Sequence, residues 1–231
     1  MTSTSRPERQ ALPLWLLVGC VGTIVGVSMG RSQSMGLYLP HVTAALGIRD
    51  RAGPPGVAFN YNSIEAAMVG EIVSRATGVP LSQYLSEKVW KPAGMESDAF
   101  YVLDGPPDVG REFTAGGFNA TLRDYARVGQ MMLDRGRANG RQLVPAGWVD
   151  ESTRPGPGHA SVEDATGYAY LWWTLDGTRA FTMLGGEGQF VFVDPDTRTV
   201  IVKLSHVPVG AAGNQASAET FAFLKAASAW R

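Results

Sequence analysis

Helical spacing of apolar residues dominates the first two thirds of this chain, and strand-like alternation dominates the last third. The clearest helix is predicted from Ser63 to Thr77, where apolar positions recur three and four residues apart. Ser63 is a suitable N-cap, Gly78 provides the stop, and Pro80 prevents continuation. Tyr61 therefore stands just before the start of this helix. The apolar positions are Ile64, Ala67, Met68 and Ile72.

Three further helices follow from the same spacing. One is predicted over Leu81–Trp90, stopped by Pro92 and Gly94. A second runs from Leu122 to Arg135, with Thr121 and Asp124 forming a capping box. A short third helix is opened by Pro145 and runs through Val149. The side chains expected to face the core are Leu81, Tyr84, Leu85 and Val89 in the first of these helices, and Leu122, Tyr125, Ala126, Met132 and Leu133 in the second.

The last third alternates as a set of strands with a closing helix. A turn at Asp194-Pro195-Asp196 separates the final two strands, which read as a hairpin. Short turns between successive strands predict an α+β fold, with a mostly antiparallel sheet and flanking helices. The predicted strands are Tyr168–Leu175, Ala180–Leu184, Gln189–Val193 and Thr199–Ser205, and the closing helix is Gln215–Ala229.

The N-terminal part has a different character. Residues 1–10 are polar and residues 11–30 form an uncharged apolar segment, long enough to cross a hydrocarbon core of about 30 Å. We expect an uncleaved transmembrane anchor, followed by a linker over residues 31–52 and a globular part over residues 53–231. A signal peptide, a lipoprotein signal ending at Cys20 and a buried core helix are the alternatives. The expected location is the bacterial cell envelope, with the globular part on the periplasmic or extracellular side.

Composition narrows the range of functions. The formal net charge is −1 over 231 residues, and the globular part has no basic block, so nucleic-acid binding is not indicated. One cysteine and three widely separated histidines give no metal-ligand spacing, so neither a metal nor another cofactor is expected.

Several motifs together resemble one enzyme family. The run PPG-x-x-F-x-Y-N-S at residues 54–63 is followed by RATGVPLSQYL, WKPAGMESDA, GGFNATLRDYARVGQ, GYAYLWW and LGGEGQFVFVDP. This series is similar to the serine β-lactamase and penicillin-binding-protein-like hydrolases, above all to the branch with 6-aminohexanoate-dimer hydrolases and esterases. The resemblance covers roughly Tyr38 to Lys203.

The resemblance implies a partial β-lactamase/transpeptidase-like fold and hydrolysis of a small-molecule amide or ester through an acyl-enzyme. By motif match, Tyr61 is the catalytic phenol and Ser63 the third position of the Tyr-x-Ser element. The glycine-rich strand end and an aromatic wall would contact the substrate. The substrate-binding candidates are Gly186, Glu187, Gly188, Gln189 and Trp173.

Two departures from the family pattern matter for the chemistry. No serine in the sequence has a lysine three residues later, so the family's S-x-x-K nucleophile motif is missing. Without that lysine, Tyr61 should keep a neutral phenol with a pKa of about 10. Glu187 stands where β-lactam-recognising members carry a basic residue, which favours amides, esters or amine-bearing substrates over penicillins. We expect a hydrolase with impaired or absent turnover; the alternative is a truncated remnant or pseudoenzyme that only binds a ligand or partner.

A second motif points to a different hydrolase. Gly26 to Gly30 match G-x-S-x-G, and Ser28 followed by Asp194 or Asp196 and then His206 has the order of an α/β-hydrolase triad. The motif lies within the apolar segment and lacks preceding strands, which disfavours this interpretation. His159 lies in a Gly/Pro/Ser-rich loop and is expected to be solvated.

Overall fold

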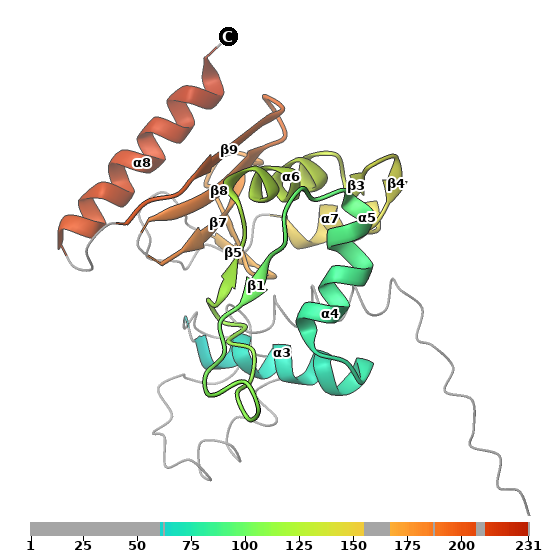
Figure 1. Ribbon diagram of the computed structural model, residues 1–231. Helices are drawn as coiled ribbons and strands as arrows, with labels where there is room; N and C mark the ends of the chain where they lie inside the picture. Colours follow the sequence, from blue (N-terminus) through green and yellow to red (C-terminus); the bar gives the residue numbers. More distant parts are fainter. Residues whose placement is uncertain (1–60, 62, 155–166, 187, 207–210, 231) are drawn as a thin grey trace, which may run out of the picture.

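A computed structural model of the chain describes Tyr61 and residues 63–154, 167–186, 188–206 and 211–230. Figure 1 shows a sheet between helix α8 on one side and helix α6 on the other, with α3 and α4 below them. The predicted α+β class with an antiparallel sheet and flanking helices is confirmed. Within these ranges no helix is both long and apolar enough to cross a membrane. The segment predicted to do so, residues 11–30, lies outside the described residues.

The main sheet is a meander of five strands. Each strand pairs with the next one in the chain, and every pairing is antiparallel. Short connections are sufficient for this topology, as the turn signals in the sequence indicated. The strands are β5 (Gly167–Ala169), β6 (Trp172–Thr174), β7 (Phe181–Gly185), β8 (Gln189–Asp194) and β9 (Thr199–Lys203).

The prediction of one strand over Tyr168–Leu175 is wrong. The chain reverses within this segment, because Tyr170 and Leu171 both have left-handed backbones, with φ of 49° and 72°. Two successive left-handed residues form the tight turn that joins β5 to β6. Such a turn does not favour either residue type. The strand-like pattern of the sequence therefore continues through the turn without a turn signal.

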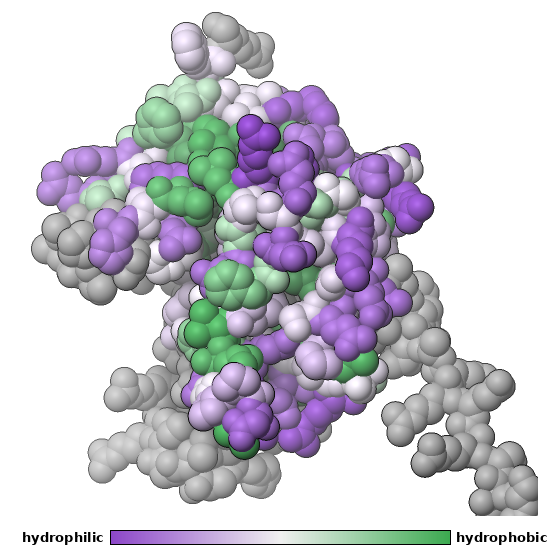
Figure 2. Space-filling model, in the orientation of Figure 1, coloured by the Kyte–Doolittle hydropathy of each residue, from purple (hydrophilic) through white to green (hydrophobic). Residues whose placement is uncertain are grey.

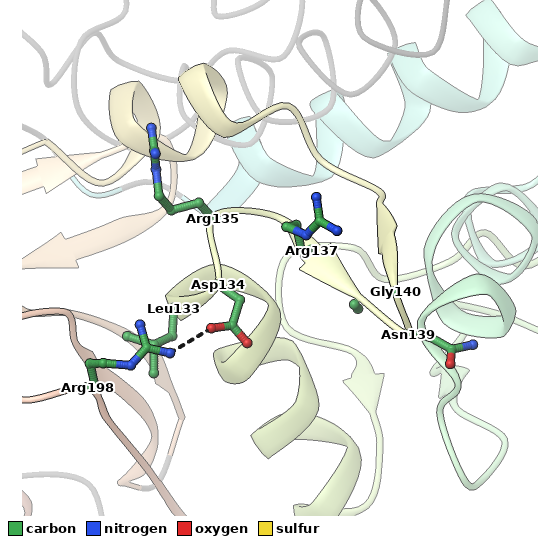
Figure 3. Close-up of a pocket in the computed structure, with 8 residues that line it drawn as sticks. Leu133, Asp134, Arg135, Arg137, Asn139, Gly140 and Arg198 are labelled. Carbon is green, nitrogen blue, oxygen red and sulfur yellow. Dashed lines mark hydrogen bonds and ion pairs between the residues drawn. The ribbon is translucent and has the colours of Figure 1, made fainter.

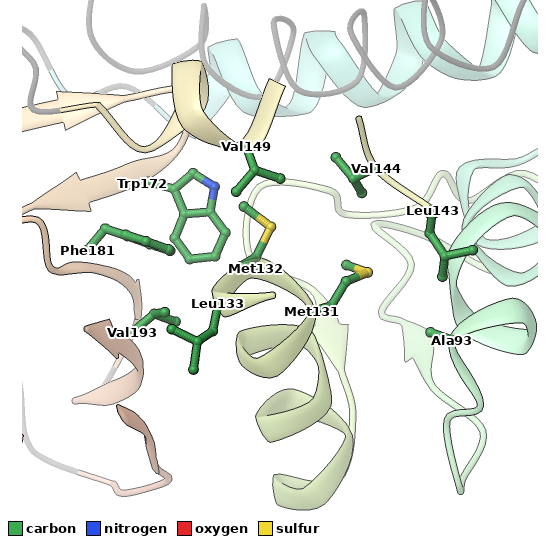
Figure 4. Packing of buried hydrophobic residues seen from close by; sticks show 10 residues of the cluster. All are labelled: Ala93, Met131, Met132, Leu133, Leu143, Val144, Val149, Trp172, Phe181 and Val193. Carbon is green, nitrogen blue, oxygen red and sulfur yellow. The ribbon is translucent and has the colours of Figure 1, made fainter. Parts of the chain in front are cut away.

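Opposite faces of the sheet build two cores. Phe190 and Phe192 of β8 pack with Phe221 and Leu224 of α8 (Ala211–Ala229) on one face. Val193 belongs to the cluster on the other face. Figure 4 shows that cluster, in which Met131, Met132 and Leu133 of α6 meet side chains from the sheet and from the segments that follow α6.

Helix α6 (Leu122–Leu133) has the predicted cap. The Thr121 hydroxyl accepts a hydrogen bond from the Asp124 backbone N–H at 3.2 Å. Leu122 was expected to face the core, but its side chain is 47% exposed. Met131 is buried on α6 together with Met132 and Leu133, so the buried face is rotated away from the first residue of the helix.

A second group of helices precedes α6. Helix α3 (Ser63–Thr77) ends at Gly78, whose φ of 74° is left-handed, as predicted. The next predicted helix begins as α4 (Leu81–Leu85) and continues as a π-helical turn, η2 (Ser86–Trp90), and then α5 (Lys91–Ala93). It passes Pro92 because this residue lies in the first turn of α5, where the missing N–H is not needed.

Short hairpins complete the chain between these helices. Strands β1 (Phe100–Tyr101) and β2 (Phe118–Asn119) pair before α6. After α6, β3 (Arg137–Ala138) pairs with β4 (Arg141–Gln142), and α7 (Ala146–Ser152) follows Pro145. The segment around β1 exposes several apolar side chains, and Figure 2 shows apolar surface there. The exposed side chains are Phe100, Val102, Val109 and Phe113.

Candidate active site

The glycine-rich loop and the β5–β6 turn lie at one end of the sheet. Strand β6 runs antiparallel to β7 with Trp173 opposite Thr182, so the start of β6 faces the end of β7. The β5–β6 turn therefore lies at the same end as Gly185, where β7 runs into the glycine-rich loop. The start of β8 and the end of β9 are also at this end, since Phe190 pairs with Lys203. We call this the glycine-loop end of the sheet.

Tyr61 lies against the middle residues of β5 and β6. Its ring stacks on Trp173, with centroids 5.9 Å apart and planes at 22°. It also meets the edge of Tyr168 at 6.4 Å and 89°, and Tyr168 and Trp173 are themselves in edge contact. Tyr168 and Trp173 are buried, while Tyr61 remains 47% exposed. The two buried rings thus hold Tyr61 in place while part of its side chain stays accessible to a ligand.

The Tyr61 phenol is protonated at neutral pH. Partial burial raises its pKa above the ordinary value of 10, and this outweighs the hydrogen bond with Ser63, which lowers it. Burial also raises the pKa of Tyr168, and the neighbouring Tyr61 adds to this effect. Tyr61 can therefore donate a proton or a hydrogen bond, whereas it is a weak general base.

Ser63 is close to Tyr61. It is the first residue of α3, it is exposed, and its side chain hydrogen-bonds the Tyr61 phenol. The structure therefore brings together three predicted site residues, Tyr61, Ser63 and Trp173.

The glycine-rich strand end is a three-residue hairpin loop. Gly185 pairs with Gln189, and the loop between them ends in Gly188, whose φ is 81°. A left-handed glycine in the last position is typical of three-residue hairpins. A side chain added at Gly186 would meet no atom within 4 Å, so the backbone is open to approach there. Glu187 lies outside the described residues.

Two residues that the sequence analysis missed hold this loop. The Lys203 ammonium donates to the Gly188 carbonyl oxygen at 2.9 Å and to the Ser205 hydroxyl at 2.7 Å. Ser205 donates to the same carbonyl at 2.5 Å. A trans peptide places C=O and N–H on opposite sides, so fixing this carbonyl also fixes the direction of the Gln189 N–H. The only signal in the sequence is a lysine and a serine two residues apart at the end of the strand.

The carboxylates of the alternative triad have other roles. Asp194 accepts a hydrogen bond from Ser228 of α8 at 2.5 Å, and Asp196 pairs with Arg179. Ser28 and His159 lie outside the described residues. In the described part of the chain, no three His, Cys, Asp or Glu side chains gather as a metal site.

A pocket of about 460 Å³ lies elsewhere, at the end of α6 and the β3–β4 hairpin. Figure 3 shows Arg198 paired with Asp134, while the Arg135 side chain points away from Arg137. The Asp134 and Arg198 groups are 2.9 Å apart, and Arg135 pairs with Asp150. The arginines therefore do not converge on one point, and the pocket shares no residue with the aromatic site around Tyr61.

The chain is similar to known proteins in sequence. The family model described as beta-lactamase matches residues 38–222. A 6-aminohexanoate-dimer hydrolase of Paenarthrobacter ureafaciens is 35% identical over 158 residues. That alignment covers 65% of this chain and 40% of the relative, so the chain spans well under half of the relative's length.

Solved structures show the same fold. A candidate 6-aminohexanoate-dimer hydrolase from Bacillus anthracis is 31% identical, with a TM-score of 0.64, and the match covers 76% of this chain and 45% of that one. A beta-lactamase from Mycobacterium bovis is 23% identical, with a TM-score of 0.57 and coverages of 78% and 68%.

Proposed function

Because this chain belongs to the beta-lactamase family, we propose that it binds small amide or ester substrates at the glycine-loop end of the sheet, in a site of the acyl-transfer type, and that its turnover is impaired. The observation that carries this proposal is the placement of Tyr61. Its protonated phenol is held by Trp173 of β6, the strand next to β7, and β7 runs into the open glycine loop.

Each part of the site has a chemical role in this proposal. Acyl transfer needs hydrogen-bond donors aimed at the developing oxyanion and a proton for the leaving group. The glycine loop supplies backbone N–H groups in a strand end that a substrate can approach closely. The Tyr61 phenol supplies the proton donor for the leaving nitrogen or oxygen.

The attacking group is the weak part of this site. The sequence has no Ser-x-x-Lys motif, and among the described residues no lysine hydrogen-bonds the Tyr61 phenol. The Ser63 hydroxyl is already engaged with that phenol. A serine attacks poorly unless an adjacent base removes its proton. Binding without efficient hydrolysis is therefore the expected behaviour.

A covalent probe tests this proposal directly. We expect a fluorophosphonate to leave the mass of the purified chain unchanged, while N-butylhexanamide gives saturation-transfer NMR signals that Trp173→Ala reduces. Stoichiometric labelling at one serine would contradict the impairment, and Ser63→Ala and Ser28→Ala would then locate the nucleophile. Absence of amide binding by the wild-type chain would contradict the site itself.

The charge of Glu187 supports a preference within this substrate class. A carboxylate in the glycine loop repels a substrate carboxylate and attracts an amine. We expect Glu187→Gln to weaken binding of 6-amino-N-butylhexanamide about threefold at low salt and to leave N-butylhexanamide unchanged. Equal effects on both ligands would show that Glu187 does not select for charge.

The apolar segment over residues 11–30 supports a location in the bacterial cell envelope, with the globular part outside the cytoplasm. We expect the full chain to stay with membranes during alkaline carbonate extraction, and a chain lacking residues 1–30 to be released. Release of both chains would contradict the anchor.

A further inference from the structure

Strand β9 (Thr199–Lys203) forms one edge of the main sheet. It pairs with β8 along its whole length, from Thr199 opposite Asp194 to Lys203 opposite Phe190, without a bulge. Within the described ranges, no strand pairs with its other side. Alternate residues of an antiparallel strand direct their N–H and C=O groups away from the neighbour. This side of β9 therefore presents a row of backbone donors and acceptors.

The two edge strands of the sheet differ in how they are protected. Proteins commonly blunt an edge with a very short strand, a proline, a bulge or a charge in the strand centre. Strand β5 at the opposite edge is only three residues long. Strand β9 has five residues, TVIVK, with neither a proline nor a central charge, and all five are partly buried. Figure 2 shows apolar surface between α8 and α6, where Figure 1 has β9.

The sequence of β9 is complementary to a second copy of itself. When two identical edges pair antiparallel about a twofold axis, one residue lies opposite its own copy. With Ile201 on the axis, Val200 lies opposite Val202 of the second copy, so the centre of the pair is formed by β-branched side chains alone. Lys203 lies opposite Thr199, and no two like charges face each other.

We propose that the protein forms a dimer in which β9 pairs antiparallel with β9 of a second copy, about a twofold axis at Ile201. The main sheet then continues across both copies. Because each copy uses the same edge, the assembly closes at two. Lys203 at the end of β9 holds the Gly188 carbonyl, so the pairing also steadies a support of the glycine loop. This inference does not depend on the proposed function.

Charge changes at Thr199 test the pairing. In the dimer Thr199 lies opposite Lys203 of the second copy, whereas within one copy it lies opposite Asp194. Thr199→Lys should weaken the dimer about fivefold through two like-charge pairs, and Thr199→Glu should strengthen it by about the same factor. Within one copy the order is reversed, because a lysine attracts Asp194 and a glutamate repels it. An effect on folding alone therefore cannot produce the expected order.

The dimer is measured on the full chain in dodecyl maltoside micelles, by light scattering and sedimentation over a range of protein concentrations. Hydrogen exchange of the wild type gives a readout that needs no substitution. Those β9 amides that point away from β8 should exchange more slowly as the protein concentration rises, while buried β8 amides should not change.

A disulfide across the axis tests the register. The sequence has one cysteine, so Ile201→Cys in a Cys20→Ser background carries a single thiol on β9. Directly opposite residues of an antiparallel pair bring their Cβ atoms within reach of a disulfide. We expect copper phenanthroline to convert Ile201→Cys into a covalent dimer. The control, Ala169→Cys on β5 in the same background, should stay monomeric.

Three results would overturn the proposal. One is a monomer at every concentration without a covalent dimer of Ile201→Cys. Another is a dimer whose affinity responds to neither Thr199→Lys nor Thr199→Glu, since it must then form elsewhere, for example through residues 11–30. The third is protection of the outward β9 amides that does not weaken on dilution, which would show that another part of the same chain occupies the edge.

Discussion

Gly136 lies where the chain leaves α6, at a position that accepts only glycine. Its φ is 83°, and a Cβ there would lie 2.0 Å from the Val144 carbonyl oxygen. Backbone cannot move away as the end of a flexible side chain can, so both the conformation and the space exclude a side chain. This explains at atomic level why a glycine follows the end of α6.

We predict that Gly136→Ala lowers the free energy of unfolding by about 3 kcal/mol. Gly140→Ala is the matched control, because Gly140 has a similar φ of 73° but nothing within 4 Å of an added Cβ. Its cost should be about 1 kcal/mol, from conformation alone. Urea unfolding measures both values, and equal costs would show that the contact with Val144 relaxes.

Asp124 is a fully buried carboxylate with several donors. The backbone N–H groups of Glu96 and Ser97 donate to it at 2.8 and 3.1 Å, and the Thr121 hydroxyl at 2.8 Å. Burial alone raises the pKa of this carboxyl, but these hydrogen bonds together with the Arg127 charge lower it below the ordinary value of 3.8. The ionised form therefore belongs to the folded state.

This lowered pKa predicts a loss of stability in acid. The contribution of Asp124 is fully present above the unfolded-state pKa of about 4, and it is lost as pH falls through the folded-state value. We expect Asp124→Asn to cost about 2 kcal/mol at pH 7 and less at pH 3. Urea unfolding at both pH values measures this, and a pH-independent cost would contradict an ionised Asp124.

Residue roles were predictable where the partner is close in sequence. Thr121 and Asp124 are three residues apart, and the hydrogen bonds between them are seen in the structure. The backbone N–H groups of Glu96 and Ser97 donate to Asp124 from more than 25 residues away in the sequence, and no local pattern indicates these hydrogen bonds. The same holds for Lys203, which reaches Gly188 across neighbouring strands.

At the scale of elements, α8 shows how one helix seals a face of the sheet. Phe221 and Leu224 are fully buried against it, while Phe223 is 61% exposed on the same helix. The buried positions recur at helical spacing, and the helix itself was predicted from the sequence. The prediction missed the start of the helix, since Ala, Gly and Asn before Gln215 carry little periodicity.

We predict that Phe221→Ala lowers the free energy of unfolding by about 4 kcal/mol, because it removes a fully buried ring and leaves a cavity. Phe223→Ala changes the same residue type on the solvent side and should cost less than about 0.5 kcal/mol. Chemical unfolding of both variants measures the difference. Similar costs would indicate that α8 does not pack as described.

The Gly188 carbonyl of the glycine loop accepts hydrogen bonds from two side chains, Lys203 and Ser205. Lys203→Met removes both hydrogen bonds of the ammonium, so the Gly188 carbonyl keeps Ser205 as its donor. We expect hydrogen exchange at the Gln189 amide to become about tenfold faster, whereas Lys91→Met, at an exposed position of α5, leaves it unchanged. An unchanged rate in Lys203→Met would show that Ser205 alone holds the loop.

Strand and helix types were largely predictable, but their connections were less so. The turn residues Asp194-Pro195-Asp196 indicated a hairpin, and the structure has this hairpin between β8 and β9. Tyr170 and Leu171 form a turn without turn residues, and the pattern could not reveal it. The Tyr61 stack on Trp173 joins residues more than 100 positions apart, which requires the folded chain.

At the scale of the whole molecule, helices α3 to α5 and the sheet meet at few places. Ala93 enters the cluster under α6, and Asp124 holds the backbone just after α5. At the other end, Tyr61 before α3 rests on Trp173. Figure 1 shows α3 and α4 below the sheet between these two joints.

We predict that residues 63–93 open before the sheet does. Native-state hydrogen exchange should give α3 amides a lower opening free energy than β8 amides, because β8 lies between two paired strands and two cores. Asp124→Asn should lower the α3 value further and leave β8 less affected. Equal values for α3 and β8 in the wild type would show a single cooperative unit.

The joint at Asp124 has a consequence for the evolution of this protein. Tyr61 is joined both to α3, which it precedes, and to Trp173 of the sheet, so a substitution that loosens the joint at Asp124 and Glu96 changes how firmly the helices hold the phenol without altering any residue around it. Selection on the candidate site can therefore act at this remote joint while the residues around Tyr61 stay the same.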